Sequence, residues 1–522
     1  ILSAVCSKAS MHTTLFIWFL IYTDIYASLC DIDIITPDSS QSLLSYKNSR
    51  PVILRGLLSN WPSISYFLSQ YGNISVQTGY EPSIVFSNGR ADDMHPIDSL
   101  STGHRYNISD ILVFDVNVLK TNPKILNDYS TPHILSHFGS DIDRDSVSPV
   151  LSIGGLNLGL PFHMHGEAWL GLVNGQKKWF LYPPGYHLPR NIQRSWRPYT
   201  GTSHWISHVL EDAFSKLKSV PYSPRRYSAQ ECLSTTDTDG EDCEVASRGQ
   251  RGYRPLECVQ MTGDVMYVPA GWSHMTLNIH GISETSSDVL QDYAHSTLRD
   301  ESGLVVGIGE QAVWLASDRI SLSQAIILGG NSMDCDAHRN MAVGLLSRAV
   351  TVYQQGNVSE AIVHLKQAEK HLRVALDIRP LHPDIHMMLV DTTLKLASWG
   401  DEIYETIAKE SVAAAERNLN ELYNELELDI QKEQGVAVAL HRLATLISDE
   451  LPHDAVRILE KSISIGRLNS KALAQRVFLY ERLGKIAEAL KALDDMELVT
   501  PGSVYIDKIR AYLKSKLVLD PR

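Results

Sequence analysis

The chain has 522 residues, and its 47 Lys and Arg against 60 Asp and Glu give a formal net charge of −13 at pH 7. At ~150 residues per domain, this length predicts about three domains. The acidic balance argues against a nucleic-acid binder, which needs a basic face to displace counterions from phosphates. A chain that is 44% apolar and 20% charged is neither disordered nor fibrous. No apolar run approaches the ~20 residues of a transmembrane helix, so we expect no membrane span.

The N-terminal segment has the pattern of a secretory signal peptide. Met11 offers a start residue, an apolar stretch covers residues 13–22, and small residues begin at Ala27. A short apolar stretch followed by small residues predicts cleavage between Ala27 and Cys30. The alternative is a buried first helix. We therefore assign residues 1–30 to the upstream residues and the signal peptide.

Three sequons without a blocking proline agree with a secretory route, and they place candidate N-glycosylation sites at Asn73, Asn107 and Asn357. We expect the protein in the endoplasmic reticulum lumen or secreted. The chain has six cysteines. Cys232 and Cys243 flank an acidic, Thr-rich loop and could close a small disulfide, but spacing alone leaves the connectivity open.

The residue pattern changes near the middle of the chain. From residue 31 to 300, short apolar, β-branched runs alternate with Gly, Pro, Asn and Ser, which is typical of strands and turns. Within this β domain, the poorly patterned residues 185–253 indicate an inserted loop. From 340 to 516, Ala, Leu, Glu and Lys recur at helical spacing. The expected fold class is multidomain β plus α, with residues 301–339 as the junction.

The helical half contains a weak internal repeat. Gly484, Ala489 and Pro501 stand at the relative offsets of a 34-residue helix-turn-helix repeat, and Ala455 lies 34 residues before Ala489. Over residues 340–516 the pattern resembles the tetratricopeptide family, whose stacked helix pairs build concave binding surfaces. The resemblance implies a protein substrate or partner for this half. The repeats are irregular in the middle, so a generic helical bundle stays the alternative.

The residues with most chemistry to offer are histidines of the β half. His163 and His165 are two residues apart on a predicted strand and therefore share one face. A second predicted strand runs into a Pro-Ala-Gly turn, and His274 opens the returning strand, which could bring it beside the first two. Imidazoles buried together are costly unless a divalent metal satisfies them. The alternative is a hydrogen-bonded polar cluster that holds no metal.

Several ordered motifs surround these histidines. The spacing G-x5-P-x-G-x2-H-x3-N resembles the second cupin motif, and it is met at Gly263, Pro269, Gly271, His274 and Asn278. Between the two histidine segments lie the piece Gly175-Gln176-Lys177-Lys178-Trp179 and a turn that ends in Tyr182-Pro183-Pro184. Over residues 45–300 the whole set resembles the JmjC-domain, cupin-like family.

This resemblance implies a double-stranded β-helix, which is a jelly-roll barrel. It also implies a site for Fe(II) with open positions for 2-oxoglutarate and oxygen. By motif, His163 and His274 match the two family histidines. Lys177 matches the lysine that pairs with the far carboxylate of 2-oxoglutarate, and Lys178 is the alternative if the strand carries a bulge.

The sequence departs from the family at two positions. The family's carboxylate falls at His165, so the expected metal ligands are His163, His165 and His274, and Leu160 stands where many hydroxylases place Thr or Ser. Three neutral imidazoles still bind divalent transition metals, of which we expect Fe(II). Glu167 is a minority alternative for the missing carboxylate. The HxH version resembles the small endoplasmic-reticulum-luminal branch of the JmjC proteins.

Two functions stay open on these residues. One is a metal-binding protein of the secretory pathway that acts as an Fe(II)/2-oxoglutarate-dependent hydroxylase, which is a dioxygenase. The other is a catalytically degenerate cupin scaffold that mediates protein–protein interactions through its helical repeats. Histone demethylation is disfavoured because the sequence contains no basic reader segment. A cupin sugar isomerase is disfavoured because Trp169 and Leu170 stand where its glutamate would be.

Overall fold

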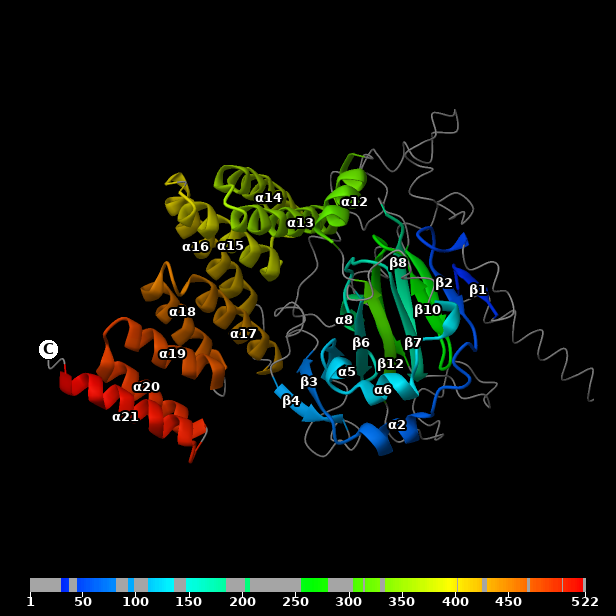
Figure 1. Cartoon of the computed structure of the whole chain (residues 1–522), viewed down its shortest axis with the longest axis horizontal. Coiled ribbons are helices and arrows are strands. Elements are labelled where there is room, and N and C mark those ends of the chain that lie inside the picture. Colours follow the sequence, from blue (N-terminus) through cyan, green and yellow to red (C-terminus); the bar gives the residue numbers. More distant parts are fainter. Residues whose placement is uncertain are drawn as a thin grey trace, which may run out of the picture. The chain divides into compact units, whose positions relative to one another are not determined.

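The structure is a computed structural model of the chain (Figure 1). It describes residues 30–36, 45–80, 93–97, 111–135, 147–184, 202–206, 255–279, 304–312, 315–328, 334–400, 402–424, 430–466, 470–499 and 501–519. The chain divides into a β-rich unit, which includes residues 95–187 and 214–313, and a helical unit, which includes residues 314–522. The expected order of a β-rich region followed by a helical one is therefore confirmed. The predicted signal peptide lies outside the described residues.

Short helices and twelve strands make up the first part of the described chain. In chain order they are β1 (Asp33–Ile35), β2 (Val52–Leu54), α2 (Ile64–Tyr71), β3 (Ser75–Tyr80), β4 (Asp93–Pro96), β5 (Ile111–Asp115), α5 (Val118–Thr121), α6 (Pro123–Asp128), η3 (His133–Leu135), β6 (Val147–Gly154), β7 (Ala168–Asn174), β8 (Gln176–Tyr182), α8 (Thr202–Trp205), β9 (Leu256–Gln260), β10 (Val265–Val268), β11 (Ser273–Ile279) and β12 (Val305–Ala312).

These strands form two sheets. The larger has the order β1-β2-β10-β7-β12-β6-β5-β3-β4, and the smaller has the order β11-β8-β9. Strands distant in sequence lie side by side in the larger sheet, since β10 separates β2 from β7, and β12 separates β7 from β6. Two sheets with crossovers of this kind fit the double-stranded β-helix that the motifs imply. Strand β12 falls within residues 301–339, the range assigned above to a junction.

The barrel core lies between the two sheets. Because side chains alternate along a strand, Met266 and Val268 of β10 pack with Trp179 of β8 and Leu256 of β9 in one buried cluster. Tyr267, between them in the sequence, packs on the other face of the larger sheet. The inward side chains of β8 and β10 thus line one interior. His274 of β11 and His163, its bridge partner, lie in the same interior.

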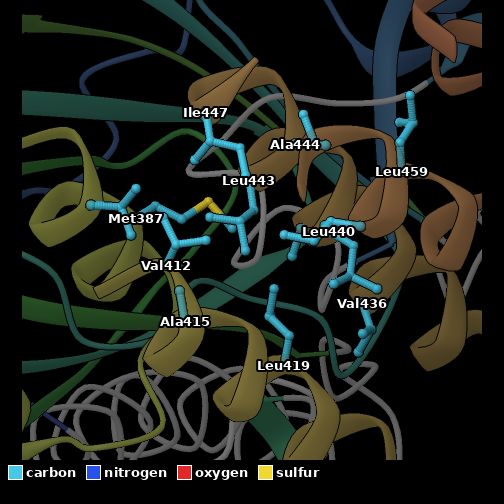
Figure 2. Close-up of a cluster of buried hydrophobic side chains, with 14 of the residues drawn as sticks. Met387, Val412, Ala415, Leu419, Val436, Leu440, Leu443, Ala444, Ile447 and Leu459 are labelled. Atoms are coloured by element: carbon cyan, nitrogen blue, oxygen red, sulfur yellow. The ribbon is translucent and has the colours of Figure 1, made fainter. Parts of the chain in front are cut away.

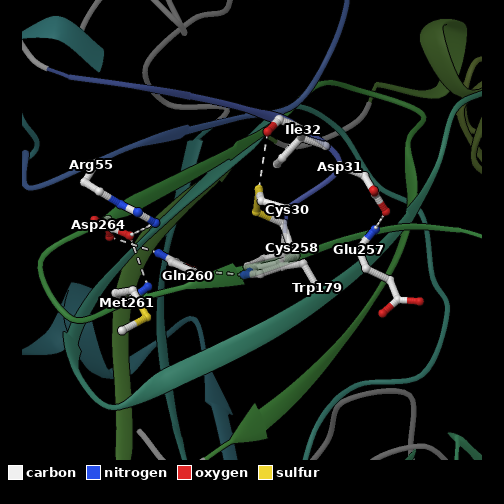
Figure 3. The surroundings of a disulfide bond; sticks show 10 residues. All are labelled: Cys30, Asp31, Ile32, Arg55, Trp179, Glu257, Cys258, Gln260, Met261 and Asp264. Carbon is white, nitrogen blue, oxygen red and sulfur yellow. Dashed lines mark hydrogen bonds and ion pairs between the residues drawn. A yellow bond between two sulfur atoms is a disulfide. The ribbon is translucent and has the colours of Figure 1, made fainter. Parts of the chain in front are cut away.

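A disulfide ties the start of the described chain to the smaller sheet (Figure 3). Cys30 is bonded to Cys258 of β9, which is 228 residues away in the sequence. Next to it, the Asp31 amide donates to the Glu257 carbonyl over 2.7 Å, and the Glu257 amide donates to an Asp31 carboxylate oxygen over 2.9 Å. Cys232 and Cys243, the pair considered above, lie outside the described residues.

Helices make up the described chain from residue 316 onward. They are α12 (Ala316–Leu328), α13 (Cys335–Gln354), α14 (Val358–Ile378), α15 (Pro383–Ser398), α16 (Ile403–Asn424), α17 (Ile430–Ile447), α18 (Pro452–Ile465), α19 (Ser470–Arg482), α20 (Ile486–Val499) and α21 (Val504–Leu519). Each packs on the next along the chain. None of the described helices is both long and apolar enough to cross a membrane.

Local sequence explains where these helices begin and turn. Gly356 and Gly484 have φ of 86° and 72°, a backbone region that favours glycine, and they separate α13 from α14 and α19 from α20. Asn357 caps α14: its side-chain Oδ1 accepts from the Glu360 main-chain amide over 3.2 Å, and its side-chain Nδ2 donates to the Glu360 carboxylate over 2.8 Å.

Apolar side chains from the five helices α15 to α19 meet in one core of the helical unit, part of which is drawn in Figure 2. Met387 of α15, Leu419 of α16, Leu440 of α17 and Leu459 of α18 belong to it. Small side chains belong to the same core, among them Ala415 of α16. This core is shared between successive helix pairs, so each pair depends on its neighbours for stability.

Candidate metal centre

The backbone brings His163 and His274 together although 111 residues separate them. The two residues form an isolated antiparallel bridge, with the His163 amide donating to the His274 carbonyl over 3.0 Å and the reverse bond measuring 2.9 Å. His274 lies on β11, where it pairs with Leu181 of β8. His165 follows two residues after His163, so a single bridge positions both histidines of the first segment beside the third.

The three imidazole rings converge. Ring centroids are 5.3 Å apart for His163 and His165, 4.3 Å for His163 and His274, and 4.5 Å for His165 and His274. One nitrogen from each ring lies within 4.8 Å of the others. Among the described residues, this is the one group of three or more potential metal ligands from His, Cys, Asp or Glu, and it contains no carboxylate.

Each ring is held by a hydrogen bond from its Nδ1 atom to a main-chain carbonyl. The acceptors are Pro161 for His163 at 2.8 Å, Gly166 for His165 at 2.7 Å, and Trp272 for His274 at 2.9 Å. A carbonyl oxygen only accepts, so Nδ1 carries the hydrogen in each neutral ring and Nε2 carries the lone pair. Metal-bound histidines typically have this second hydrogen bond, which orients the ring.

The surroundings keep His274 neutral. Its side chain is buried, and burial, followed by the nearby rings of His163 and His165, holds the pKa of His274 well below its usual range. A neutral imidazole is the form that coordinates a metal. The Trp272 carbonyl opposes this shift but does not reverse it.

A cavity with about 540 Å³ of empty space, part of it open to solvent, adjoins the three rings. Leu160, Leu170 and Val268 give it apolar walls, while Ser152, Thr276 and Gln311 bring polar groups. Thr276 could have been found from the sequence, because it follows His274 by two residues on the same strand face. Ser152 and Gln311 have no such signal, since their places depend on how β6 and β12 pair.

Lys177 lines this cavity and Lys178 does not. Strands β8 and β11 pair in regular register without a bulge, and Lys177 lies opposite Asn278. Lys177 is 3% exposed, and its ammonium donates to the Asn278 side-chain oxygen over 2.7 Å. Burial lowers the pKa of Lys177 to about 8. Lys178 pairs instead with Glu257 over 2.8 Å.

Glu167 lies away from the three histidine nitrogens. Its carboxylate accepts from the Tyr267 hydroxyl over 2.6 Å, and it does not belong to the group of converging ligand atoms. Leu160 offers the cavity an alkyl side chain, and its amide donates to the Thr276 hydroxyl over 3.3 Å. Glu167 therefore does not supply the carboxylate that is missing from the three histidines. Residue 160, a leucine, supplies no hydroxyl to the cavity.

The predicted glycosylation sites lie outside this centre. Asn73 is exposed in the turn that follows α2. Asn357 is exposed as well, but its side chain caps α14. Asn107 lies outside the described residues.

The described chain resembles several JmjC-domain proteins in sequence. It is 26% identical over 255 residues to the lysine-specific demethylase JMJ21 of Arabidopsis thaliana, which is 45% of this chain and 22% of that protein. It is 27% identical over 248 residues to JmjC domain-containing protein 8 of Homo sapiens, and the alignment covers 45% of this chain and 74% of that protein. It is 24% identical over 253 residues to the bifunctional arginine demethylase and lysyl-hydroxylase psr-1 of Caenorhabditis elegans, and the alignment covers 44% of this chain and 52% of that protein.

No family model matches the chain. Among solved structures, it aligns with YrrB, described as a TPR protein with an unusual peptide-binding site, at 13% identity over 38% of this chain and 84% of that one; the TM-score of 0.23 is too low to support an argument. The described β half carries the histidine bridge, the buried lysine and the packed sheets that the motifs predict. In sequence, this chain is therefore similar to JmjC-domain proteins.

Proposed function

We propose that His163, His165 and His274 hold a divalent metal ion. The observation that carries this proposal is the set of three Nδ1-to-carbonyl hydrogen bonds, which leaves the lone pair of each ring on Nε2, in a group where one nitrogen of each ring lies within 4.8 Å of the others. Imidazole suits Fe, Zn, Cu and Ni, so the donor set fits a divalent transition metal. Fe(II) is the ion we propose, because it is the metal of the family.

We further propose that the β half is an Fe(II)/2-oxoglutarate-dependent hydroxylase. Lys177 supports this, since a buried ammonium with one neutral partner, Asn278, is suited to pair with a carboxylate of 2-oxoglutarate. Leu160 and Val268 contribute apolar side chains to the lining of the same cavity. When bound, iron with 2-oxoglutarate and oxygen would supply the oxidation of a substrate C–H bond. Demethylase and hydroxylase names among the relatives describe those proteins.

A second function is favoured by two specific observations. His165 occupies the place of the family's carboxylate, and Leu160 supplies no hydroxyl to the cavity. A barrel changed in these ways could serve as a scaffold, with helices α13 to α21 binding a partner protein along their stacked pairs. In that case the metal would stabilise the barrel without turnover.

We propose the secretory pathway, in the endoplasmic reticulum lumen or beyond it, as the compartment. The Cys30–Cys258 disulfide supports it, because such bonds persist in oxidising compartments. The exposed sequon at Asn73 supports it too. The proposed cleavage site lies before Cys30, which leaves the paired cysteine in the mature chain. Expression in a secretory host should give a protein that begins there and carries glycan on Asn73; an intact, unglycosylated N-terminus would contradict the assignment.

The metal and the reaction are tested in two steps. Elemental analysis of natively purified protein, before and after metal addition, should show about one ion per chain in the wild type and none in His163→Ala. Next, 2-oxoglutarate turnover with Fe(II) is compared for the wild type, His163→Ala, Lys177→Ala and the matched control Lys178→Ala. Turnover in the wild type and in Lys178→Ala alone supports the hydroxylase. Metal binding with equal background turnover in all four variants favours the scaffold.

A further inference from the structure

The main chain around His165 is packed against two other segments. The Gly271 amide donates to the His165 carbonyl over 3.1 Å, and the Ala312 amide donates to the Glu167 carbonyl over 2.8 Å. A Cβ atom on Gly166 would lie 2.6 Å from the Ala312 carbonyl oxygen, so only glycine fits there. His165 therefore lies on a short segment whose position is set by β12 and by the turn before His274.

One side-chain hydrogen bond reinforces this segment. The Tyr267 hydroxyl, on β10, donates to the Glu167 carboxylate over 2.6 Å, and both side chains are buried. The same hydroxyl accepts from the Asn48 amide over 3.2 Å. Burial and Glu167 raise the pKa of Tyr267 well above its usual range, so the hydroxyl keeps its proton. Tyr267 thus links the residue two places after His165 to a turn far upstream.

That upstream turn also reaches the other ligand segment. Residues 46–50 form a tight turn in which Asn48 has a left-handed φ of 57°. The Trp272 indole donates to the Ser49 carbonyl over 3.3 Å, and the Trp272 carbonyl is the acceptor that orients His274. The turn at residues 46–50 therefore braces His165 through Tyr267 and Glu167, and His274 through Trp272.

We propose that Glu167 and Tyr267 are positioning residues of the metal centre. Neither touches the metal. Their hydrogen bond, anchored on the turn at residues 46–50, fixes the His165 segment so that its ring stays aimed at the other two. The inference rests on the proposed metal binding by the three histidines. Mutation of a residue that orients a metal ligand through a hydrogen bond typically lowers metal affinity by about 10–100-fold.

The test measures Zn²⁺ affinity by competition with a chromophoric chelator, the Co²⁺ absorption spectrum, and thermal unfolding of the metal-free protein. Tyr267→Phe and Glu167→Leu remove the bond, and each should weaken Zn²⁺ binding about tenfold and shift the Co²⁺ bands. Glu167→Gln keeps an accepting oxygen for the Tyr267 hydroxyl and should retain wild-type affinity. Tyr71→Phe is the matched control, because Tyr71 is also a buried tyrosine whose hydroxyl donates to an acidic side chain, Asp128, but it takes no part in the turn at residues 46–50.

Each result decides the question. Unchanged affinity and spectrum in both Tyr267→Phe and Glu167→Leu would overturn the positioning role, as would an equal loss in Tyr71→Phe. If Tyr267→Phe does not fold, the Glu167→Leu and Glu167→Gln pair tests the same bond from its other end. A wild type that takes up neither Zn²⁺ nor Co²⁺ would instead refute the proposed metal site itself, a failure distinguishable from the loss of a positioning bond.

Discussion

Replacing Lys177 with Met should change how the stability of the β-rich unit depends on pH. Burial lowers the pKa of this lysine from 10.5 to about 8. Between these values the unfolded chain still holds a proton that the folded protein has released, so the free energy of unfolding rises with pH across this window. Below pH 8 both states hold the proton, and stability is lower by about 3 kcal/mol.

In Lys177→Met the destabilisation by the buried ammonium is absent. At pH 7 the variant gains up to about 3 kcal/mol, offset by about 1–3 kcal/mol because the Asn278 oxygen loses its donor. Near pH 10.5 the wild-type lysine no longer lowers stability, and only the lost hydrogen bond to Asn278 distinguishes the variant. The free energy of unfolding of the variant relative to the wild type therefore falls by about 3 kcal/mol from pH 7 to 10.5. A buried, weakly compensated cation that lowers stability is expected where a protein binds an anion.

Urea unfolding in steps from pH 7 to 10.5, followed by near-ultraviolet circular dichroism, measures this difference. Lys178→Met is the matched control, since the Lys178 side chain is one third exposed and paired with Glu257. Its curve should run parallel to that of the wild type over the whole range. If the Lys177→Met curve does so too, the lysine is not desolvated in solution and the argument for a poised anion site fails.

Three further outcomes follow from the packing. Cys30→Ser should lower stability by about 2–5 kcal/mol, because it opens a very long loop, and adding reductant should lower the unfolding temperature of the wild type but not of the variant. Leu440→Ala should lower the free energy of unfolding by about 2–5 kcal/mol in calorimetry or urea titration, whereas the exposed Leu498→Ala should change it by less than about 0.5 kcal/mol. Asn357→Ala should lower it by about 1 kcal/mol through loss of the α14 cap, and equal stability of variant and wild type would show that the cap contributes nothing.

The local part of the site could be predicted from the sequence. The predicted strand over His163 and His165 is wrong, since the structure has only an isolated bridge at His163, but the two rings still lie together as expected. Motif spacing added His274 and Lys177. Glycine at an inter-helix turn is also a local requirement, as Gly484 shows with its positive φ. The choice between Lys177 and Lys178 depended on whether β8 carries a bulge, and only its pairing with β11 decided it.

Contacts between distant segments had no signal in the chain. Nothing near Tyr267 indicates that its hydroxyl binds Glu167, and Cys30 gives no hint of Cys258, its partner 228 residues away. By itself the sequence determined which residues are inward or outward on each strand and where helices begin, because alternation and capping act over a few neighbours. Which strands adjoin, and so what braces His165, was decided by the tertiary structure, because strand order follows from burying both sheets in one core.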